Sequence, residues 1–252
     1  MPVVRPRSYA AIDLGTNNCR LLIARPQEGE LVVIDAFSRI VRLGEGLHST
    51  GRISEAAMDR TVAALAICAD KLRRRHVTLS RAVATEACRR AANGVELADR
   101  VRRETGIVLD IISAAEEARL AALGCHNLME PGDGPALIFD IGGGSTELMH
   151  VDISDHDVAI RDWISVPWGV VSLTEHAPPS EDNLSARQAS YAHMRAVTRE
   201  AFAGFAERVK CYEGQPLRLL GTSGTVTTLA SVFLDLPRYD RRAVDGLVVP
   251  TD

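Results

Sequence analysis

Residues 9–24 read YAAIDLGTNNCRLLIA, two apolar runs joined by a turn of glycine and asparagine. This pattern predicts a β-hairpin. The same order returns at residues 136–151, which read ALIFDIGGGSTELMHV, with three consecutive glycines in the turn. A repeat of this kind predicts a fold that is built twice from one kind of unit.

The segments around the two hairpins alternate between strand and helix patterns. Strands are expected at 31–36, 77–84, 107–112, 158–166 and 217–220. Helices are expected at 53–72, 114–123 and 185–210 and after residue 225, with Ser54 as the cap of the first and Gly124 as the stop of the second. A further helix is expected to begin at a capping box of Asn93 and Glu96 and to end at Gly106. The alternation predicts an α/β architecture.

The densest cluster of chain-breaking residues lies at 129–135, which reads MEPGDGP. Such a cluster marks a loop or a linker. We therefore expect one domain over residues 1–128 and a second over 129–252.

Composition excludes several classes of protein. The chain of 252 residues has a net charge of -4, so it lacks the overall basic field of a nucleic-acid binder, and no nucleic acid is expected as a partner. It has neither a signal-peptide pattern nor an apolar run long enough to span a bilayer, so no membrane partner is expected and the cytoplasm is the expected location. The five cysteines have no metal or redox spacing and are expected to be buried thiols: Cys19, Cys68, Cys88, Cys125 and Cys211.

Each hairpin turn follows an aspartate, Asp13 in the first and Asp140 in the second. Glycines allow backbone N–H groups to close around an anion, and hydroxyl or amide side chains add donors. An aspartate cannot itself attract phosphate, so it is best explained as a ligand of a hard cation. The turns therefore predict phosphate and metal together, with these phosphate-binding residues: Gly15, Thr16, Asn17, Asn18, Gly142, Gly143, Gly144, Ser145 and Thr146.

A third glycine-containing turn, GTSGT at 221–225, lies between a predicted strand and a predicted helix. It can present backbone donors and a helix N-terminus to an anion, although such turns also occur for geometric reasons. Its candidate phosphate-binding residues are Gly221, Ser223, Gly224 and Thr225.

Two adjacent carboxylates, Glu116 and Glu117, open the helix predicted at 114–123. Neighbouring helical side chains point about 100° apart, so at most one of them can be catalytic. Taken alone, the pair also fits a solvated first turn that complements the helix dipole.

The motifs at residues 12–17, 84–89, 116–119, 139–147 and 221–225 resemble, in order and approximate spacing, those of the exopolyphosphatase and guanosine pentaphosphate phosphatase family. The resemblance extends from about Tyr9 to Leu247. It implies two ribonuclease-H-like domains of the sugar kinase, heat-shock-70 and actin superfamily, with the active site in the cleft between them. It also implies that the chain releases terminal phosphate from polyphosphate or from pppGpp, a nucleotide of the stringent response.

The resemblance assigns roles to individual residues. Glu117 looks like the general base that activates water, and Arg89 looks like the cation that grips the terminal phosphate. Asp140 and Glu147 resemble the residues that position Mg²⁺ or another divalent cation, and Asp13 joins them as a metal candidate. Cys88 precedes Arg89, but the Cys-x5-Arg pattern of cysteine phosphatases is absent, so we expect it to pack in the core.

Two departures from the family pattern stand out. Thr16 and Asn18 replace serines that are usual in the first turn, and Asn18 exchanges a hydroxyl for an amide. The similar family members also continue beyond residues 244–247 with further helix, which leaves open whether the second domain is complete.

Two other functions stay open at this point. One is an ATP-dependent small-molecule kinase of the same superfamily, although no acceptor pocket is evident in the sequence. The other is a non-catalytic sensor of alarmones or nucleotides. The choice between polyphosphate and pppGpp also stays open, as does the oligomeric state, for which a homodimer is one option.

Overall fold

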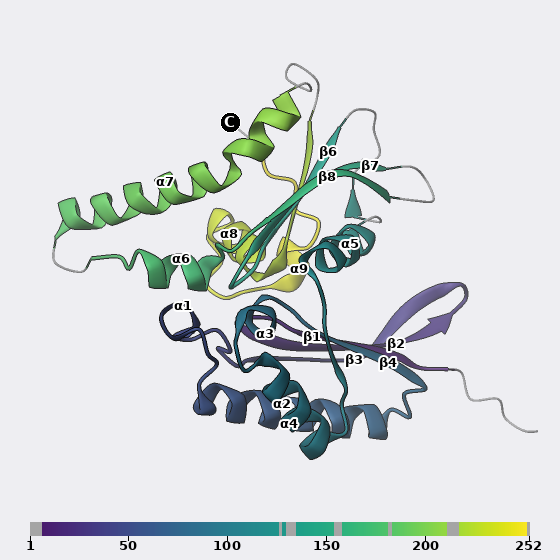
Figure 1. The fold of residues 1–252 in the computed structure, drawn as a ribbon. Helices are drawn as coiled ribbons and strands as arrows, with labels where there is room; N and C mark the ends of the chain where they lie inside the picture. Colours follow the sequence, from purple (N-terminus) through teal and green to yellow (C-terminus); the bar gives the residue numbers. More distant parts are fainter. Residues whose placement is uncertain are drawn as a thin grey trace, which may run out of the picture. The chain divides into compact units, whose positions relative to one another are not determined.

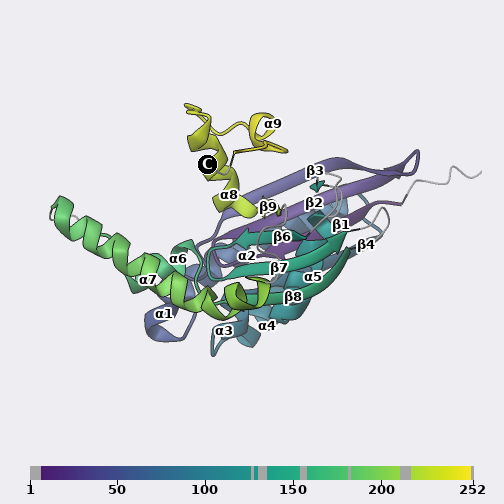
Figure 2. The ribbon, with the colours of Figure 1, turned by 90° about the horizontal axis from the view of Figure 1, so that it is seen from above.

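The computed structural model describes residues 7–125, 128–129, 135–153, 158–180, 183–210 and 217–250. The chain divides into two units, Met1–Ser113 and Ala114–Asp252, and each has a sheet of its own (Figures 1 and 2). The boundary expected at 128/129 would leave the helix that follows Ser113 in the first domain, whereas the structure groups it with the second. Residues 130–134 and Cys211 lie outside the described residues.

The first unit contains a five-stranded mixed sheet in the order β3-β2-β1-β4-β5. The predicted hairpin is present as an antiparallel pair, β1 (Tyr9–Leu14) and β2 (Asn18–Gln27). Strand β3 (Glu30–Ile40) extends the hairpin in antiparallel fashion, whereas β4 (Leu79–Ala84) and the short β5 (Leu109–Ile111) add parallel strands.

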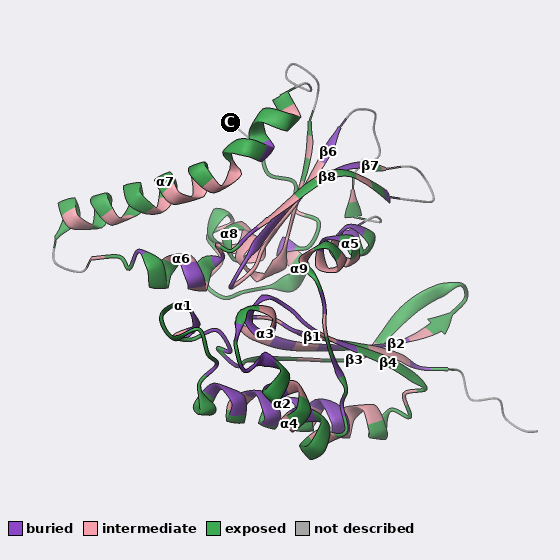
Figure 3. Cartoon of the chain, viewed as in Figure 1, coloured by how far each residue is buried: buried purple, intermediate pink, exposed green. Residues whose placement is uncertain are grey.

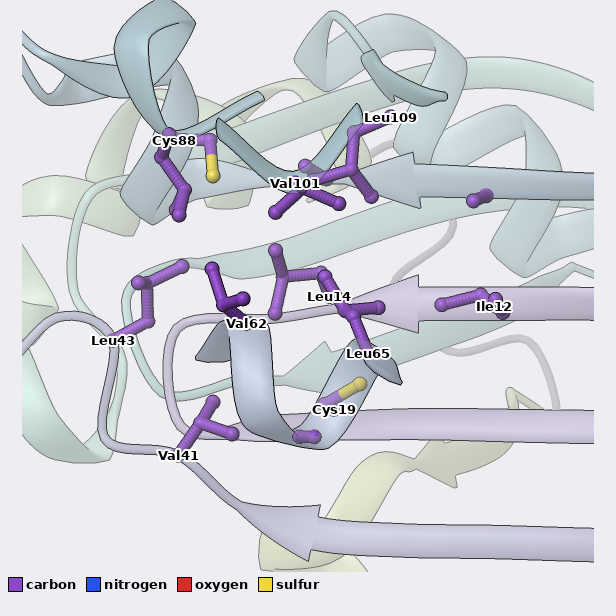
Figure 4. Close-up of a cluster of buried hydrophobic side chains, with 14 of the residues drawn as sticks. Ile12, Leu14, Cys19, Val41, Leu43, Val62, Leu65, Cys88, Val101 and Leu109 are labelled. Carbon is purple, nitrogen blue, oxygen red and sulfur yellow. The ribbon is translucent and has the colours of Figure 1, made fainter. Parts of the chain in front are cut away.

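One face of this sheet is covered by two helices, α2 (Glu55–Arg74) and α4 (Gly94–Thr105). Alternate residues of β1 point into the core, where Ile12 and Leu14 pack with Leu65 of α2 and Val101 of α4 (Figure 4). The Ser54 side chain accepts a hydrogen bond from the N–H of Ala57, so the predicted cap of α2 is confirmed. Two short helices complete the unit, α1 (Leu47–Thr50) and α3 (Glu86–Arg90).

The capping box predicted at Asn93 and Glu96 is wrong. Asn93 is the N-cap residue of α4, but its side chain makes no bond to that helix. It accepts from the N–H of Ile53 and donates to the Ile53 carbonyl, both at 2.9 Å. The buried amide thus joins the start of α4 to the segment before α2, a partner that local sequence cannot reveal. Gly106 ends α4 in the left-handed conformation, φ 78°, as predicted.

The second unit contains a four-stranded mixed sheet in the order β8-β7-β6-β9. Strands β6 (Ala136–Ile141), β7 (Thr146–Ile153) and β8 (Val158–Val166) are antiparallel, and β9 (Arg218–Thr222) lies parallel to β6. This order matches that of β3-β2-β1-β4 in the first unit, so the predicted repeat is confirmed. The shared topology makes the residues of the two units comparable position by position.

Helix α5 (Ala114–Cys125) packs on one face of this sheet, where its Ala118 and Ala122 meet Ile138 and Met149. Gly124 therefore lies inside the helix and not beyond its end. Helix α8 (Ser223–Phe233) lies on the opposite face, because a Cβ on Gly221 would meet the ring of Phe139 and the side chain of Val226. Phe139 and Ile138 are neighbours along β6 and point to opposite faces.

Three more helices belong to this unit: α6 (Val170–His176), α7 (Leu184–Val209) and the short α9 (Arg241–Val244). Helix α7 buries only Phe205, and Figure 3 shows most of its length as exposed or intermediate. Among the described residues, no helix combines the length and hydropathy needed to span a bilayer.

Candidate functional site: two braced turns and a pair of carboxylates

The first turn, Gly15–Asn18, is closed on itself and held from outside. The N–H of Gly15 donates to the carbonyl of Asn18 at 2.9 Å. Beyond β3, the N–H groups of Val41 and Arg42 donate to the Asn17 carbonyl, and that of Gly44 donates to the Thr16 carbonyl. We call residues 41–44 the first brace. The brace binds the carbonyl groups of the turn. The backbone N–H groups of the turn therefore stay available for other partners.

The second turn, Gly142–Ser145, repeats this arrangement. The N–H of Gly142 donates to the carbonyl of Ser145 at 3.0 Å. Beyond β8, the N–H groups of Val170 and Val171 donate to the carbonyls of Gly142 and Gly143. We call residues 169–172 the second brace. A Cβ on Gly169 would overlap the backbone of Gly142 and Gly143, so only glycine allows this close approach.

Both turns keep backbone donors available. Within the described part of the chain, the N–H groups of Thr16, Asn17, Gly143 and Gly144 have no hydrogen-bond partner. Successive N–H groups without partners in a turn form the kind of concave donor surface that binds phosphate. Both turns therefore keep backbone donors that could contact an anion, and phosphate binding by these turns stays a prediction.

Some predicted phosphate donors have structural partners instead. The hydroxyl of Thr146 donates to the Trp168 carbonyl at 2.7 Å, next to the second brace. The hydroxyl of Ser223 donates to the Ile141 carbonyl at 3.0 Å, which ties the third turn to the second. Ser223 also has a φ of 83°, a left-handed conformation that non-glycine residues seldom adopt and that often marks a functional site.

A row of four polar side chains crosses the second sheet beside its turn. Asp140 on β6 lies directly opposite Glu147 on β7, Glu147 lies opposite Ser165 on β8, and Asp140 is in register with Thr222 on β9. Residues opposite each other share a face, and their Cβ atoms are about 5 Å apart. The structure thus brings together Asp140 and Glu147, two of the predicted metal ligands.

The row is packed tightly against the end of helix α5. Glu147 is only 2% exposed, and the Ser165 hydroxyl donates to its Oε1 at 2.7 Å. Burial raises the pKa of the Cys125 thiol, the negative charge of Asp140 raises it further, and a hydrogen bond from Thr222 opposes both effects. Cys125 of α5 therefore lies beside Asp140 and Thr222, on the face of the sheet that α5 covers.

The same positions in the first unit carry different charges. Asp13 lies opposite Arg20, and Arg20 lies opposite Ser38. Burial raises the pKa of the Asp13 carboxyl, and the nearby Arg20 partly offsets that rise. The first unit therefore pairs a carboxylate with a cation where the second pairs two carboxylates.

The acid pair fits a magnesium ion. Among the described residues, no group of three or more His, Cys, Asp or Glu side chains is arranged to hold a metal. Mg²⁺ does not need such a cage, because it is usually held by one or two carboxylates together with substrate phosphates and water. Two carboxylates facing each other across a sheet also repel, and a cation relieves that repulsion. Asp140 and Glu147 suit this role better than Asp13, whose neighbour is already a cation.

The two glutamates at the start of α5 are distinguished by Arg119. Its guanidinium forms a bidentate pair with Glu116, at 2.7 and 2.9 Å. Glu117 points in another direction from the same half-buried first turn. Glu116 is thus engaged in an ion pair with Arg119, and the role of Glu117 as general base stays a prediction.

Arg89 has partners that the sequence did not reveal. Its Nη2 donates to Glu86 at 2.6 Å, and its Nη1 donates to the Ile112 carbonyl at 2.8 Å. Both Arg89 and Glu86 are largely buried, with side chains 22% and 11% exposed. The neighbouring Cys88 is buried, and burial raises the pKa of its thiol to about 12, which suits a packed thiol and not a nucleophile.

The braces are the segments of the candidate site that sequence reasoning missed. A signal was present in the glycines at 44 and 169, each a few residues beyond the third strand of its unit. Only an alignment of the two repeats that extends to Gly44 and Gly169 could have shown that these glycines are equivalent.

Comparisons with known proteins agree with this arrangement. A family model described as the Ppx/GppA phosphatase family matches residues 22–238. Among curated proteins, Exopolyphosphatase 2 of Mycobacterium tuberculosis (strain CDC 1551 / Oshkosh) is 34% identical over 258 residues, which cover 96% of this chain and 75% of the relative.

Solved structures give the same result. A crystal structure of an exopolyphosphatase from Cytophaga hutchinsonii has a TM-score of 0.80 at 28% identity, over 91% of this chain and 70% of the other. The Aquifex aeolicus member of the Ppx/GppA protein family has a TM-score of 0.69 at 32% identity, over 95% and 74%. These likenesses confirm the predicted fold class.

Proposed function

Because this chain belongs to the Ppx/GppA phosphatase family, we propose that it releases terminal orthophosphate from inorganic polyphosphate by attack of water. The observation that carries the proposal is the second unit's arrangement. One face of its sheet carries the acid pair Asp140 and Glu147, the donor-rich turn Gly142–Ser145 connects the same two strands, and the first turn of α5 carries Glu117.

Each group has a chemical task in this proposal. Glu117 orients the attacking water and accepts its proton, so that oxygen can attack the terminal phosphorus in line with the leaving oxygen. The N–H groups of Gly143 and Gly144 stabilise the charge on the phosphoryl oxygens. Asp140 and Glu147 would hold Mg²⁺, which supplies charge neutralisation to the phosphates when bound.

In the first unit, we propose that the turn Gly15–Asn18 offers the N–H groups of Thr16 and Asn17 to a phosphate of the polyanion. Arg89 supplies positive charge, and Glu86 with the Ile112 carbonyl fixes the direction of its guanidinium.

The test is phosphate release by the purified chain with Mg²⁺ on polyphosphate, pppGpp and ATP in parallel. We expect release from polyphosphate and little from ATP; release from pppGpp would extend the substrate range within the family. A folded protein that releases phosphate from none of them, yet binds pppGpp, would support the sensor alternative. Rapid turnover of ATP would favour the kinase-like alternative.

Two isosteric variants test the base. Glu117→Gln should lower kcat by about 10²- to 10⁴-fold, the usual contribution of a general base. Glu116→Gln is the matched control, one residue away and engaged with Arg119, and should retain nearly full activity. Undiminished turnover in a correctly folded Glu117→Gln protein would refute the assigned role.

A further inference from the structure

Ser165 has a contact that the proposed chemistry does not use. Its hydroxyl donates to Oε1 of Glu147 at 2.7 Å, from the strand directly beside it. Ser165 is half-buried, and Glu147 is buried. The bond joins β8 to β7 at one end of the polar row Ser165, Glu147, Asp140 and Thr222.

The repeat shows that the fold itself does not require this hydrogen bond. The equivalent residue in the first unit is Ser38 on β3, opposite Arg20. Ser38 is exposed, and no side-chain hydrogen bond joins it to any described residue. The two serines occupy the same place in the same sheet topology. Of the two, only Ser165, which lies beside a carboxylate, forms a side-chain hydrogen bond to a described residue. We therefore attribute this bond to the presence of the acid pair.

A hydrogen bond to one carboxylate oxygen restricts rotation about the last bond of the glutamate side chain. Partners of this kind orient metal ligands in proteins, and their loss typically weakens metal binding by about 10- to 100-fold. Glu147 benefits from such restraint because Asp140 lies directly opposite and would otherwise repel it. A fixed carboxylate meets the near-octahedral demands of Mg²⁺ better than a mobile one.

We propose that Ser165 is a positioning residue, which holds the Glu147 carboxylate beside Asp140 so that the two can bind a divalent cation. This inference rests on one part of the proposed function, namely that the acid pair is the cation site. Ser165 itself acts through Glu147.

The experiment is a Mn²⁺ titration of the full chain without substrate, followed by electron paramagnetic resonance, with melting temperatures measured in parallel. Ser165→Ala should raise the Kd for Mn²⁺ about 10-fold. Ser165→Thr keeps the hydroxyl and should restore affinity. Ser38→Ala, the matched change in the first unit, should leave Mn²⁺ affinity unchanged.

A double variant tests the route of action. If Ser165 acts through Glu147, adding Ser165→Ala to Glu147→Gln should cause no further loss of Mn²⁺ affinity. An additive loss would overturn the proposal, as would a Ser165→Ala protein with a lower melting temperature but unchanged Mn²⁺ affinity, or a wild-type chain that binds no Mn²⁺. Because the titration needs no turnover, failure to hydrolyse polyphosphate would contradict the proposed function and leave this result intact.

Discussion

The methyl group of Thr16 lies where a Cβ on Gly44 would be, so the first turn and its brace pack without room for a side chain between them. Thr16 is one of the two residues that depart from the family's usual serine. The contact therefore couples a choice of residue in the turn to a glycine in the brace.

Gly44→Ala should destabilise the first unit by about 1–3 kcal/mol, the usual cost of overpacking, because its Cβ would overlap the Thr16 methyl group. Thermal unfolding and phosphate release measure the effect. The double variant Thr16→Ser with Gly44→Ala should regain the lost stability, since serine lacks that methyl. The remaining contacts of the new Cβ, with the carbonyl oxygen and Cβ of residue 16, lie at 3.6 and 3.7 Å. A double variant as damaged as the single one would show that the methyl is not the obstacle.

Arg89→Ala should reduce stability as well as activity. It leaves the largely buried Glu86 carboxylate with Arg90 at 3.7 Å as its remaining ion pair, and we expect a loss of about 1–3 kcal/mol in urea unfolding. Adding Glu86→Gln should restore stability but not turnover. Recovery of both would mean that Arg89 serves only to neutralise Glu86.

Asp13→Asn should stabilise the first unit at neutral pH. Burial raises the pKa of this carboxyl, so its ionised form costs stability in the folded state. That cost is absent below the unfolded pKa of about 3.9 and grows as the pH rises toward the higher folded pKa. Metal-free thermal unfolding of both proteins between pH 4 and neutrality measures the difference. A wild-type protein that is the more stable one at neutral pH would contradict this account.

Asp35 should show the opposite pH dependence. This carboxylate of β3 is bound by Lys71 of α2 at 2.7 Å and by Arg75, the residue after that helix, at 2.9 Å. Both cations lower the pKa of Asp35 to about 2. The resulting stability is fully present above the unfolded pKa of about 3.9 and is lost as the pH falls toward 2. Urea unfolding of the wild type and Asp35→Asn at pH 7 and pH 3 should show a smaller difference at the lower pH. An equal difference at both would exclude this ion pair as the cause.

Local patterns in the sequence predicted most of the elements and failed at contacts between distant segments. Ser54 caps α2 and Gly106 ends α4 because these signals act within a few residues of the helix end. Asn93 has the same local signature as a cap, yet its amide bonds Ile53, 40 residues away. A capping pattern cannot tell these outcomes apart, because the competing partner is brought in by tertiary packing.

The candidate site divides in the same way. The alternation of side chains along strands brings Asp140 and Glu147 together, and the repeat located their turn. The partners that hold Glu147, Arg89 and Glu116 could not be predicted, since each is a side-chain geometry set by packing. Helical spacing could say only that at most one of Glu116 and Glu117 can be catalytic, and it could not predict the bidentate bond between Arg119 and Glu116.

Each turn is held by a brace from its own unit, mainly through bonds between backbone groups, and the Ser172 hydroxyl of the second brace adds a bond to the Gly144 carbonyl. The turn side chains make none of these brace bonds, so turn residues other than Thr16, whose methyl packs on Gly44, could change without loss of those bonds. Such a loop is a portable scaffold for protein engineering: the hydroxyl and amide positions could be varied in a library to alter anion preference, while the glycines at 44 and 169 are kept constant.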